Sequence, residues 1–214
     1  MATYRVDNVP LAIRPIFLLF SYGMAVVLFI YAQFVHQTSD IECTGSERIE
    51  GGRYIFCHWH TFIALYFVVF THHDYHAWMQ HPFWYMKPIH ILLRWLGVEK
   101  IVLGSSGHDG RQAADELVPL LVGGYSTVVL PDGPAGPPFV MRRGVLHLSE
   151  QSGLPIVPIR FVASRYLRLP TWDRKFLPLP FGSIKVTFGP PLTLHGLDVV
   201  EATEIIAQAL GAPS

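Results

Sequence analysis

The sequence has few charges and no excess of either sign. Of its 214 residues 15% are charged and 50% are hydrophobic, whereas an average soluble domain has about 25% charged residues. A chain this apolar is not disordered, and we expect it to meet a second apolar environment, a membrane lipid surface, besides its own core. Sixteen Lys and Arg balance sixteen Asp and Glu, which excludes the basic surface of a general nucleic-acid-binding protein.

Cysteine is also scarce, with only Cys43 and Cys57 in the chain. Two cysteines without a C-x-x-C spacing exclude a disulfide scaffold and a cysteine-based zinc or redox motif. A reducing compartment is therefore expected.

Charge is absent from one long apolar run, residues Ile16 to Val35. As a helix this run extends about 30 Å, the thickness of the hydrocarbon core of a bilayer. No A-x-A cleavage site follows it, so a secretory signal peptide is not favoured. We predict that residues 1–40 form a membrane-anchoring hydrophobic helix, which either spans the bilayer or lies in one leaflet; a buried core helix is the alternative. Arg5 and Arg14 precede the run and place the N-terminus in the cytoplasm if the helix spans.

Residues 41–214 alternate short apolar runs with helical patterns, which predicts one α/β domain with a mostly parallel central sheet flanked by helices. Strands are expected near 53–57, 99–103, 126–130, 155–161 and 184–188, and helices near 61–71, 86–96, 110–122, 143–152 and 198–209. The strand near 155–161 contains two prolines and is therefore expected at a sheet edge or at a change of direction. Residues 170–180 contain three prolines and predict a packed surface loop.

Two histidines, His58 and His60, follow the first of these strands. Strand alternation would direct both side chains to one face, where a metal ion is conceivable. Thr61, Phe62 and Ile63 follow in place of a carboxylate ligand, so we expect no metal. The histidines further on are expected in a solvated or interfacial segment without a ligand; they are His72, His73, His76 and His81.

Two glycine-rich turns follow later strands. Gly104-Ser105-Ser106-Gly107 lies between a strand and a helix, where small residues let backbone amides approach an anion. Residues 131–138 (PDGPAGPP) form a rigid turn around Asp132 at the carboxyl edge of the sheet, where α/β proteins build their sites.

In this order the motifs resemble the glycerolipid and lysophospholipid acyltransferase superfamily. The resemblance covers about residues 50–195 and is closest to a small bacterial branch. It is carried by Trp59-His60, Gly104-Ser105-Ser106, the P-D-G-P-x-G-P motif at 131–137, Arg143-Gly144-Val145 and Thr171-Trp172-Asp173-Arg174.

The resemblance implies a membrane-associated acyltransferase that moves a fatty acyl group from an acyl thioester to a lysophospholipid or related lipid. The thioester, acyl-CoA or acyl carrier protein, is a co-substrate, and no further cofactor or metal is implied. The catalytic residue it assigns is His60, as the general base that takes the acceptor's proton. The implied location is the cytoplasmic face of a bacterial inner membrane.

The chain departs from the wider superfamily in two places. The usual H-x4-D motif would put an aspartate where Leu65 stands. The carboxylate that orients His60 is then absent, or it is expected from Asp132 or failing that from Asp74. The alternative for Asp132 is that its carboxylate only caps loop amides. An arginine that binds the acceptor's phosphate in the superfamily is replaced by Ala135.

We expect either that Arg111, Arg142 or Arg143 takes the place of that arginine, or that the acceptor is not a lysophosphatidate. We also expect the Gly133 N–H to stabilise the developing oxyanion across a pocket from His60. The substrate-binding residues expected from the motifs are Gly104, Ser105, Ser106, Arg111, Gly133, Pro134, Gly136, Arg142 and Arg143. Two alternatives remain open at this point: a metal-dependent hydrolase that uses His58 and His60, and a non-catalytic lipid-binding relative.

Overall fold

A central sheet organises the molecule, which is described here from a computed structural model that covers residues 5–104 and 110–211. Five strands lie in the order β1–β9–β6–β2–β5. Their bounds are Asp40–Thr44 (β1), Ser183–Phe188 (β9), Ile156–Ala163 (β6), Ile55–Cys57 (β2) and Thr127–Val129 (β5). The pairs β1–β9, β6–β2 and β2–β5 are parallel, and β6–β9 is antiparallel. The prediction of a mostly parallel α/β sheet is confirmed.

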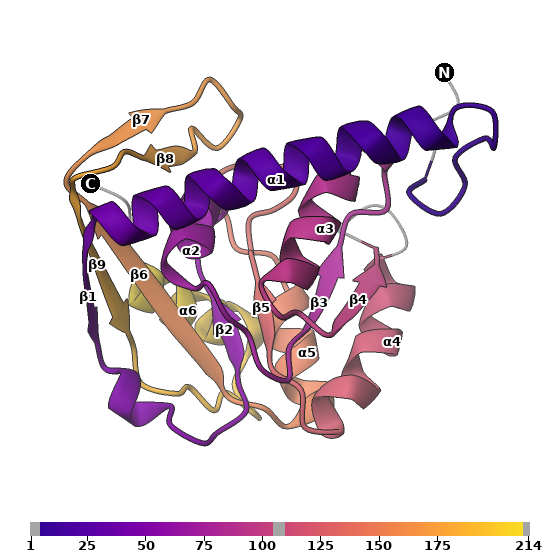
Figure 1. Cartoon of the computed structure of the whole chain (residues 1–214). Coiled ribbons are helices and arrows are strands. Elements are labelled where there is room, and N and C mark those ends of the chain that lie inside the picture. Colours follow the sequence, from indigo (N-terminus) through magenta and orange to yellow (C-terminus); the bar gives the residue numbers. More distant parts are fainter. Residues whose placement is uncertain (1–4, 105–109, 212–214) are drawn as a thin grey trace.

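Two further strands extend the sheet beyond β5. β3 (Ala77–Gln80) pairs in parallel with β4 (Lys100–Leu103). A single parallel bridge between His76 and Ser126 joins this pair to the β5 side. A separate antiparallel hairpin of β7 (Tyr166–Arg168) and β8 (Phe176–Pro178) projects from the body of the molecule (Figure 1).

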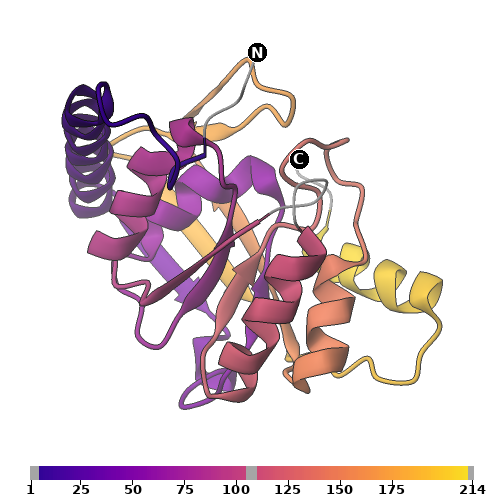
Figure 2. The same cartoon turned by 90° about the vertical axis from the view of Figure 1, so that its right-hand side faces the viewer.

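Helices cover both faces of the sheet (Figures 1 and 2). One side carries α1 (Arg14–Thr38), α2 (Ile63–Val69) and α3 (Lys87–Trp95). The other side carries α4 (Gly110–Val122), α5 (Gly144–Ser152) and α6 (Val199–Leu210). Three short 3-10 turns complete the described chain: Ser46–Arg48, His60–Phe62 and Trp84–Met86.

The core forms where the apolar stripes of the helices meet the sheet. In α4 the buried residues are Ala113, Ala114, Leu117 and Leu121, spaced as one helical face requires. The helix continues through Pro119 to Val122, so this proline does not end it. β2 and the first half of β6, residues 156–159, are buried on both faces, as expected for strands between two helical layers. In the second half of β6 one face is exposed.

The helix α1 lies along the domain, not away from it. Its buried residues are the small or apolar Ser21, Ala25, Ala32 and Val35, which form one stripe against α2 and α3. The other faces of α1 expose large apolar side chains: Ile16, Leu19, Phe20, Val26, Val27, Ile30 and Phe34. By length and composition it is the one helix in the described residues that is able to cross a membrane. Its most apolar stretch of 18 residues has a mean hydropathy of 2.1, and only 17% of that stretch is buried.

All ten predicted strands and helices are present at the expected positions, and four short strands were not predicted. β1, β3, β7 and β8 have three to five residues each and lack a clear apolar alternation. The strand near 155–161 was expected at an edge or at a change of direction. The edge position is wrong, because β6 lies between β2 and β9, but β6 changes from a parallel to an antiparallel partner after Pro158. Pro158 is the last residue that pairs with β2, and pairing with β9 begins at Ile159.

Candidate active site

His60 stands at the carboxyl end of β2, where the chain turns from the strand into α2. The strand ends at Cys57, and His60 opens a single 3-10 turn. Two contacts fix the backbone here: the indole N–H of Trp59 donates to the Gly211 carbonyl (2.7 Å), and the His60 N–H donates to Asp132 Oδ1 (2.9 Å). The imidazole is 16% exposed, so it is held in place and still accessible.

The imidazole of His60 is paired with a buried carboxylate from a distant part of the chain. His60 Nδ1 lies 2.6 Å from Asp173 Oδ2, and the Asp173 side chain is fully buried. A carboxylate only accepts hydrogen bonds, so Nδ1 carries the proton and Nε2 presents its lone pair. This arrangement makes Nε2 a suitable proton acceptor.

Other polar groups keep Asp173 ionised. Thr171 Oγ1 and Lys175 Nζ donate to its Oδ1 at 2.7 and 2.9 Å. Burial alone would raise the pKa of this carboxyl, but the hydrogen bonds from His60, Lys175 and Thr171 outweigh burial and hold the pKa well below its usual range. The Thr61 hydroxyl also binds the Asp173 backbone carbonyl (2.6 Å), which ties the 169–175 loop to the turn that carries His60.

The expectation that Asp132 orients the imidazole is wrong. Its Oδ1 accepts the His60 backbone N–H, and its Oδ2 accepts the Phe139 N–H at 3.0 Å. With both oxygens on backbone amides, this buried aspartate fixes the 131–139 loop against β2. Asp74, the second candidate, is exposed and pairs with His72 Nε2 at 3.0 Å.

The glycine-rich loop packs directly on the imidazole. A Cβ atom on Gly133 would lie 2.8 Å from His60 Cδ2, and a Cβ atom on Gly136 would lie 2.6 Å from the Trp172 ring. Trp172 in turn lies against the imidazole, with ring centroids 5.1 Å apart. Gly133 therefore faces His60 as expected. Its N–H, however, donates to the Leu130 carbonyl (3.1 Å), so the expectation that this amide receives the oxyanion is wrong.

A cavity of about 770 Å³ opens beside His60, within the range of small-molecule sites. Gly104, Gly133 and Pro134 line it, as do two of the three predicted arginines, Arg111 and Arg143. Among the described residues that line the cavity there is no Asp or Glu, and its inner wall is apolar, with Ile63, Trp78, Met79, Met86, Leu117 and Leu148. The cavity therefore combines an apolar wall with positive charge.

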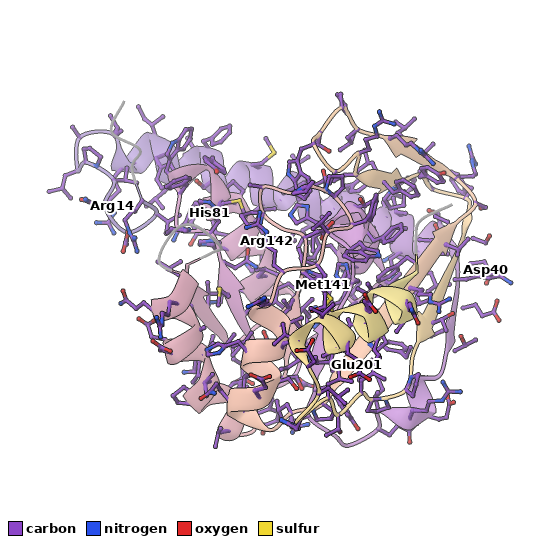
Figure 3. All side chains as sticks on the ribbon, turned by 180° about the vertical axis from the view of Figure 1, so that it is seen from behind. Arg14, Asp40, His81, Met141, Arg142 and Glu201 are labelled. Atoms are coloured by element: carbon purple, nitrogen blue, oxygen red, sulfur yellow. The ribbon has the colours of Figure 1, made fainter. Side chains whose placement is uncertain are left out.

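Of the remaining predicted site residues, Arg142 and Gly136 take other positions. Arg142 does not line the cavity; its guanidinium binds the Gly136 carbonyl and stabilises the loop. Gly136 packs under Trp172. Ser105 and Ser106 lie outside the described residues. In Figure 3 Arg142 and His81 are labelled in the upper half of the molecule, which is the side on which α1 lies.

His58 lies apart from this chemistry. The strand ends before it, so the alternation expected for His58 and His60 does not apply. Its ring is fully buried, stacks on Tyr66 (centroids 5.0 Å apart), and binds the Trp59 carbonyl through Nδ1 (2.9 Å). Burial lowers its pKa to about 3. In the part of the chain that is described, no group of three or more His, Cys, Asp or Glu side chains is placed to hold a metal ion.

The histidines after α2 are not all in a solvated segment. His73 and His76 are buried, contrary to expectation, with ring centroids 4.9 Å apart and contacts to Trp78. His72 is exposed, as expected for that segment.

Sequence reasoning missed Asp173, the residue that completes the site. It lies 113 positions after His60, and the resemblance gave its T-W-D-R motif no role. The available signal was the polar cluster around Asp173, with Thr171 and Lys175, in an otherwise proline-rich and apolar segment. A buried aspartate needs hydrogen-bond donors close to it in sequence or in space, and this cluster offers them.

Comparison with known proteins agrees with this fold. No family model matches the chain. An uncharacterized protein, RP090, of Rickettsia prowazekii (strain Madrid E) is 28% identical over 177 residues, which cover 80% of this chain and 81% of that protein. The crystal structure of the 1-acyl-sn-glycerophosphate (LPA) acyltransferase PlsC from Thermotoga maritima is similar with a TM-score of 0.52 over 93% of this chain and 89% of that one, at 18% identity. The chain thus has the fold of that acyltransferase.

Proposed function

We propose that this protein is a membrane-associated acyltransferase that transfers a fatty acyl group from an acyl thioester to the hydroxyl of a lysophospholipid or a related lipid. The observation that carries the proposal is the pair of His60 and Asp173 beside a cavity with an apolar wall. The fold it shares with the Thermotoga acyltransferase supports the same reaction class.

The chemistry uses the free Nε2 of His60. As the acceptor hydroxyl attacks the thioester carbonyl carbon, Nε2 takes the hydroxyl proton, and Asp173 stabilises the imidazolium that forms. The tetrahedral intermediate then collapses: the carbon–sulfur bond breaks, His60 returns the proton to the thiolate, and an ester and a free thiol leave. In this proposal Asp173 takes the role of the aspartate that the H-x4-D motif lacks here. This supports a catalytic protein over the alternative of a non-catalytic lipid-binding relative.

The arginines at the cavity are suited to the anionic part of a substrate. Arg111 and Arg143 stand at the starts of α4 and α5, and no carboxylate on the described cavity wall competes for them. Guanidinium groups bind phosphate strongly. We assign them to a phosphate of the lipid acceptor or of the thioester donor.

Membrane association rests on α1. The stripe from Ser21 to Val35 that packs on the domain spans about 21 Å of the helix axis. A helix crossing the bilayer along its normal would draw α2 and α3 into the hydrocarbon. We therefore propose that α1 lies in one leaflet, parallel to the surface, with its exposed apolar face in lipid. Because thioester donors are cytoplasmic, the leaflet is the cytoplasmic one.

The test is an acyl-transfer assay on the full-length protein in detergent micelles. Palmitoyl-CoA and a palmitoyl acyl carrier protein are each offered with a panel of lysophospholipids, and products are identified by mass spectrometry. We expect one new diacyl lipid with the wild type and with His72→Ala, whose histidine is exposed and outside the site. His60→Ala is expected to lose at least about 100-fold in rate. Equal rates for His60→Ala and the wild type would refute the proposal.

A further inference from the structure

The β7–β8 hairpin carries positive charge that no carboxylate of residues 5–104 or 110–211 balances by an ion pair. Arg165, Arg168 and Arg174 are exposed. Between residues 164 and 182 the one acidic residue is Asp173, which is buried and bound to His60 and Lys175. Arg165 donates to the Phe181 carbonyl, and Arg168 lies over the rings of Tyr166 and Phe176. The three guanidinium charges therefore stay at the surface of the hairpin.

Large apolar side chains lie among these arginines. Leu167 is 52% exposed and Phe181 is 67% exposed. Phe181 meets Phe34 of α1 edge to face, with centroids 6.1 Å apart, and the Tyr31 hydroxyl of α1 donates to the Pro178 carbonyl. The hairpin is thus continuous with the exposed apolar face of α1, and both lie toward one end of the molecule (Figures 1 and 2).

We propose that the β7–β8 hairpin docks on an anionic lipid surface, with its arginines on the headgroups and Leu167 and Phe181 in the interface. The inference rests on the proposed function, since the loop of this hairpin holds Asp173 against His60. Docking would put the catalytic pair at the surface where lipid acceptors lie. An acidic protein would also attract the arginines, but the exposed leucine and phenylalanine and their continuity with α1 favour lipid.

The experiment measures co-sedimentation of the full-length protein with vesicles. One set is phosphatidylcholine alone, and the other contains about one-third phosphatidylglycerol. The hairpin variant carries Arg165→Gln, Arg168→Gln and Arg174→Gln. The control variant carries Arg48→Gln, Arg53→Gln and Lys100→Gln, which removes the same charge from exposed residues around the opposite, amino ends of β2 and β4.

We expect wild-type protein to prefer the anionic vesicles and to lose that preference at high ionic strength. Each basic residue at an anionic surface strengthens binding about fivefold, so the hairpin variant should bind the anionic vesicles roughly 100-fold more weakly. Binding to neutral vesicles should not change, and the control variant should behave as the wild type does. If the hairpin variant folds poorly, a wild type without any preference for anionic vesicles would still overturn the proposal.

Two outcomes would overturn the inference. Equal loss in both variants would mean that net charge, not the hairpin, decides binding. Unchanged vesicle binding together with a raised KM for an acyl carrier protein would assign the arginines to a protein partner. Vesicle binding needs no acyl transfer, so a protein that fails the transfer assay but shows the expected vesicle preference would contradict the proposed function and leave the docking surface intact.

Discussion

At the scale of single residues, two buried aspartates of the site have separate tasks. Asp173 contacts the imidazole and Asp132 contacts backbone amides. The same substitution at the two positions should therefore affect different properties. Asp173→Asn removes the charge that stabilises the imidazolium and no longer fixes the tautomer, so kcat should fall on the order of 100- to 10,000-fold.

Asp132→Asn is the matched comparison. An amide nitrogen would face a backbone N–H and leave a buried donor unsatisfied, at a cost of about 1–3 kcal/mol in the free energy of unfolding. We expect a Tm lower by several degrees and a smaller loss of kcat than for Asp173→Asn. Thermal unfolding and initial rates check both, and a larger loss of kcat in Asp132→Asn would reverse the assignment.

Gly133 offers a second residue-scale prediction. Gly133→Ala places a methyl group 2.8 Å from His60 Cδ2, so the catalytic ring has to move. A misplacement of a catalytic group by about 1 Å costs about 100-fold in rate, so we expect kcat/KM of Gly133→Ala to fall by about that factor.

Gly144→Ala is its control, because Gly144 also lines the cavity but has nothing within 4 Å of the added atom. This variant should keep wild-type rates. Similar losses in both alanine variants would show that the cavity wall in general, and not the contact with His60, limits the rate.

Sequence reasoning found His60 but assigned the wrong aspartate. Asp132 was expected because its loop lies at the same sheet edge as His60, and that placement is correct: the loop follows β5, which lies next to β2. The side-chain direction was not predictable, because the loop has its own unpaired N–H groups and these take both oxygens. Asp173 reaches His60 only through the fold of the hairpin, which has no short-range signature.

At the scale of elements, α1 makes the clearest prediction. Leu19, Val26 and Ile30 lie on one exposed face of the helix. If α1 lies in the leaflet plane, spin labels on cysteines at these positions should report equal depths within a few Å. If the helix crosses the bilayer, residues 19 and 30 should differ by about 16 Å.

The measurement is power-saturation EPR in vesicles, with the exposed Cys43 replaced beforehand. A label at the buried Ala25 position would disturb the packing on α3, so the exposed face alone is used. A graded depth along the helix would contradict the in-plane arrangement.

The elements that sequence patterns predicted well are those with one continuous apolar face, such as α4. β1 reads Asp-Ile-Glu-Cys-Thr and is mostly exposed, so it forms because it pairs with β9 and not because of its own pattern. Pairing with a distant strand is invisible to periodicity. The β7–β8 hairpin was missed for another reason: its strands have three residues each, and they lie in a proline-rich segment.

At the scale of the whole molecule, buried histidines should make the fold sensitive to acid. His58, His73, His76 and His90 are buried, and burial lowers their pKa values to about 3, 3, 4 and 4. In the unfolded chain the pKa is about 6.5. Below about pH 6.5 the unfolded chain therefore binds more protons than the folded one, and stability is lost as the pH falls toward 4.

Each such histidine contributes up to about 1.4 kcal/mol per pH unit to this loss. Urea unfolding in micelles at pH 7.5 and 5.5 should show a lower free energy of unfolding at pH 5.5. His73→Phe preserves the ring that stacks on Tyr66 and should weaken the pH dependence, whereas His72→Ala, at an exposed position, should not. A free energy of unfolding that is unchanged or higher at pH 5.5 would show that these histidines are not buried in their neutral form.

The central claim is that His60 and Asp173 act as one catalytic unit. A double-mutant cycle in kcat/KM for acyl transfer, with His60→Ala, Asp173→Ala and the double variant, tests it most directly. If the two residues act together, the double variant should be no slower than His60→Ala alone. The opposite result is a double variant slower than His60→Ala by the full factor in kcat/KM that Asp173→Ala costs by itself. It would show that the two residues contribute independently, and it would contradict a joint role of His60 and Asp173.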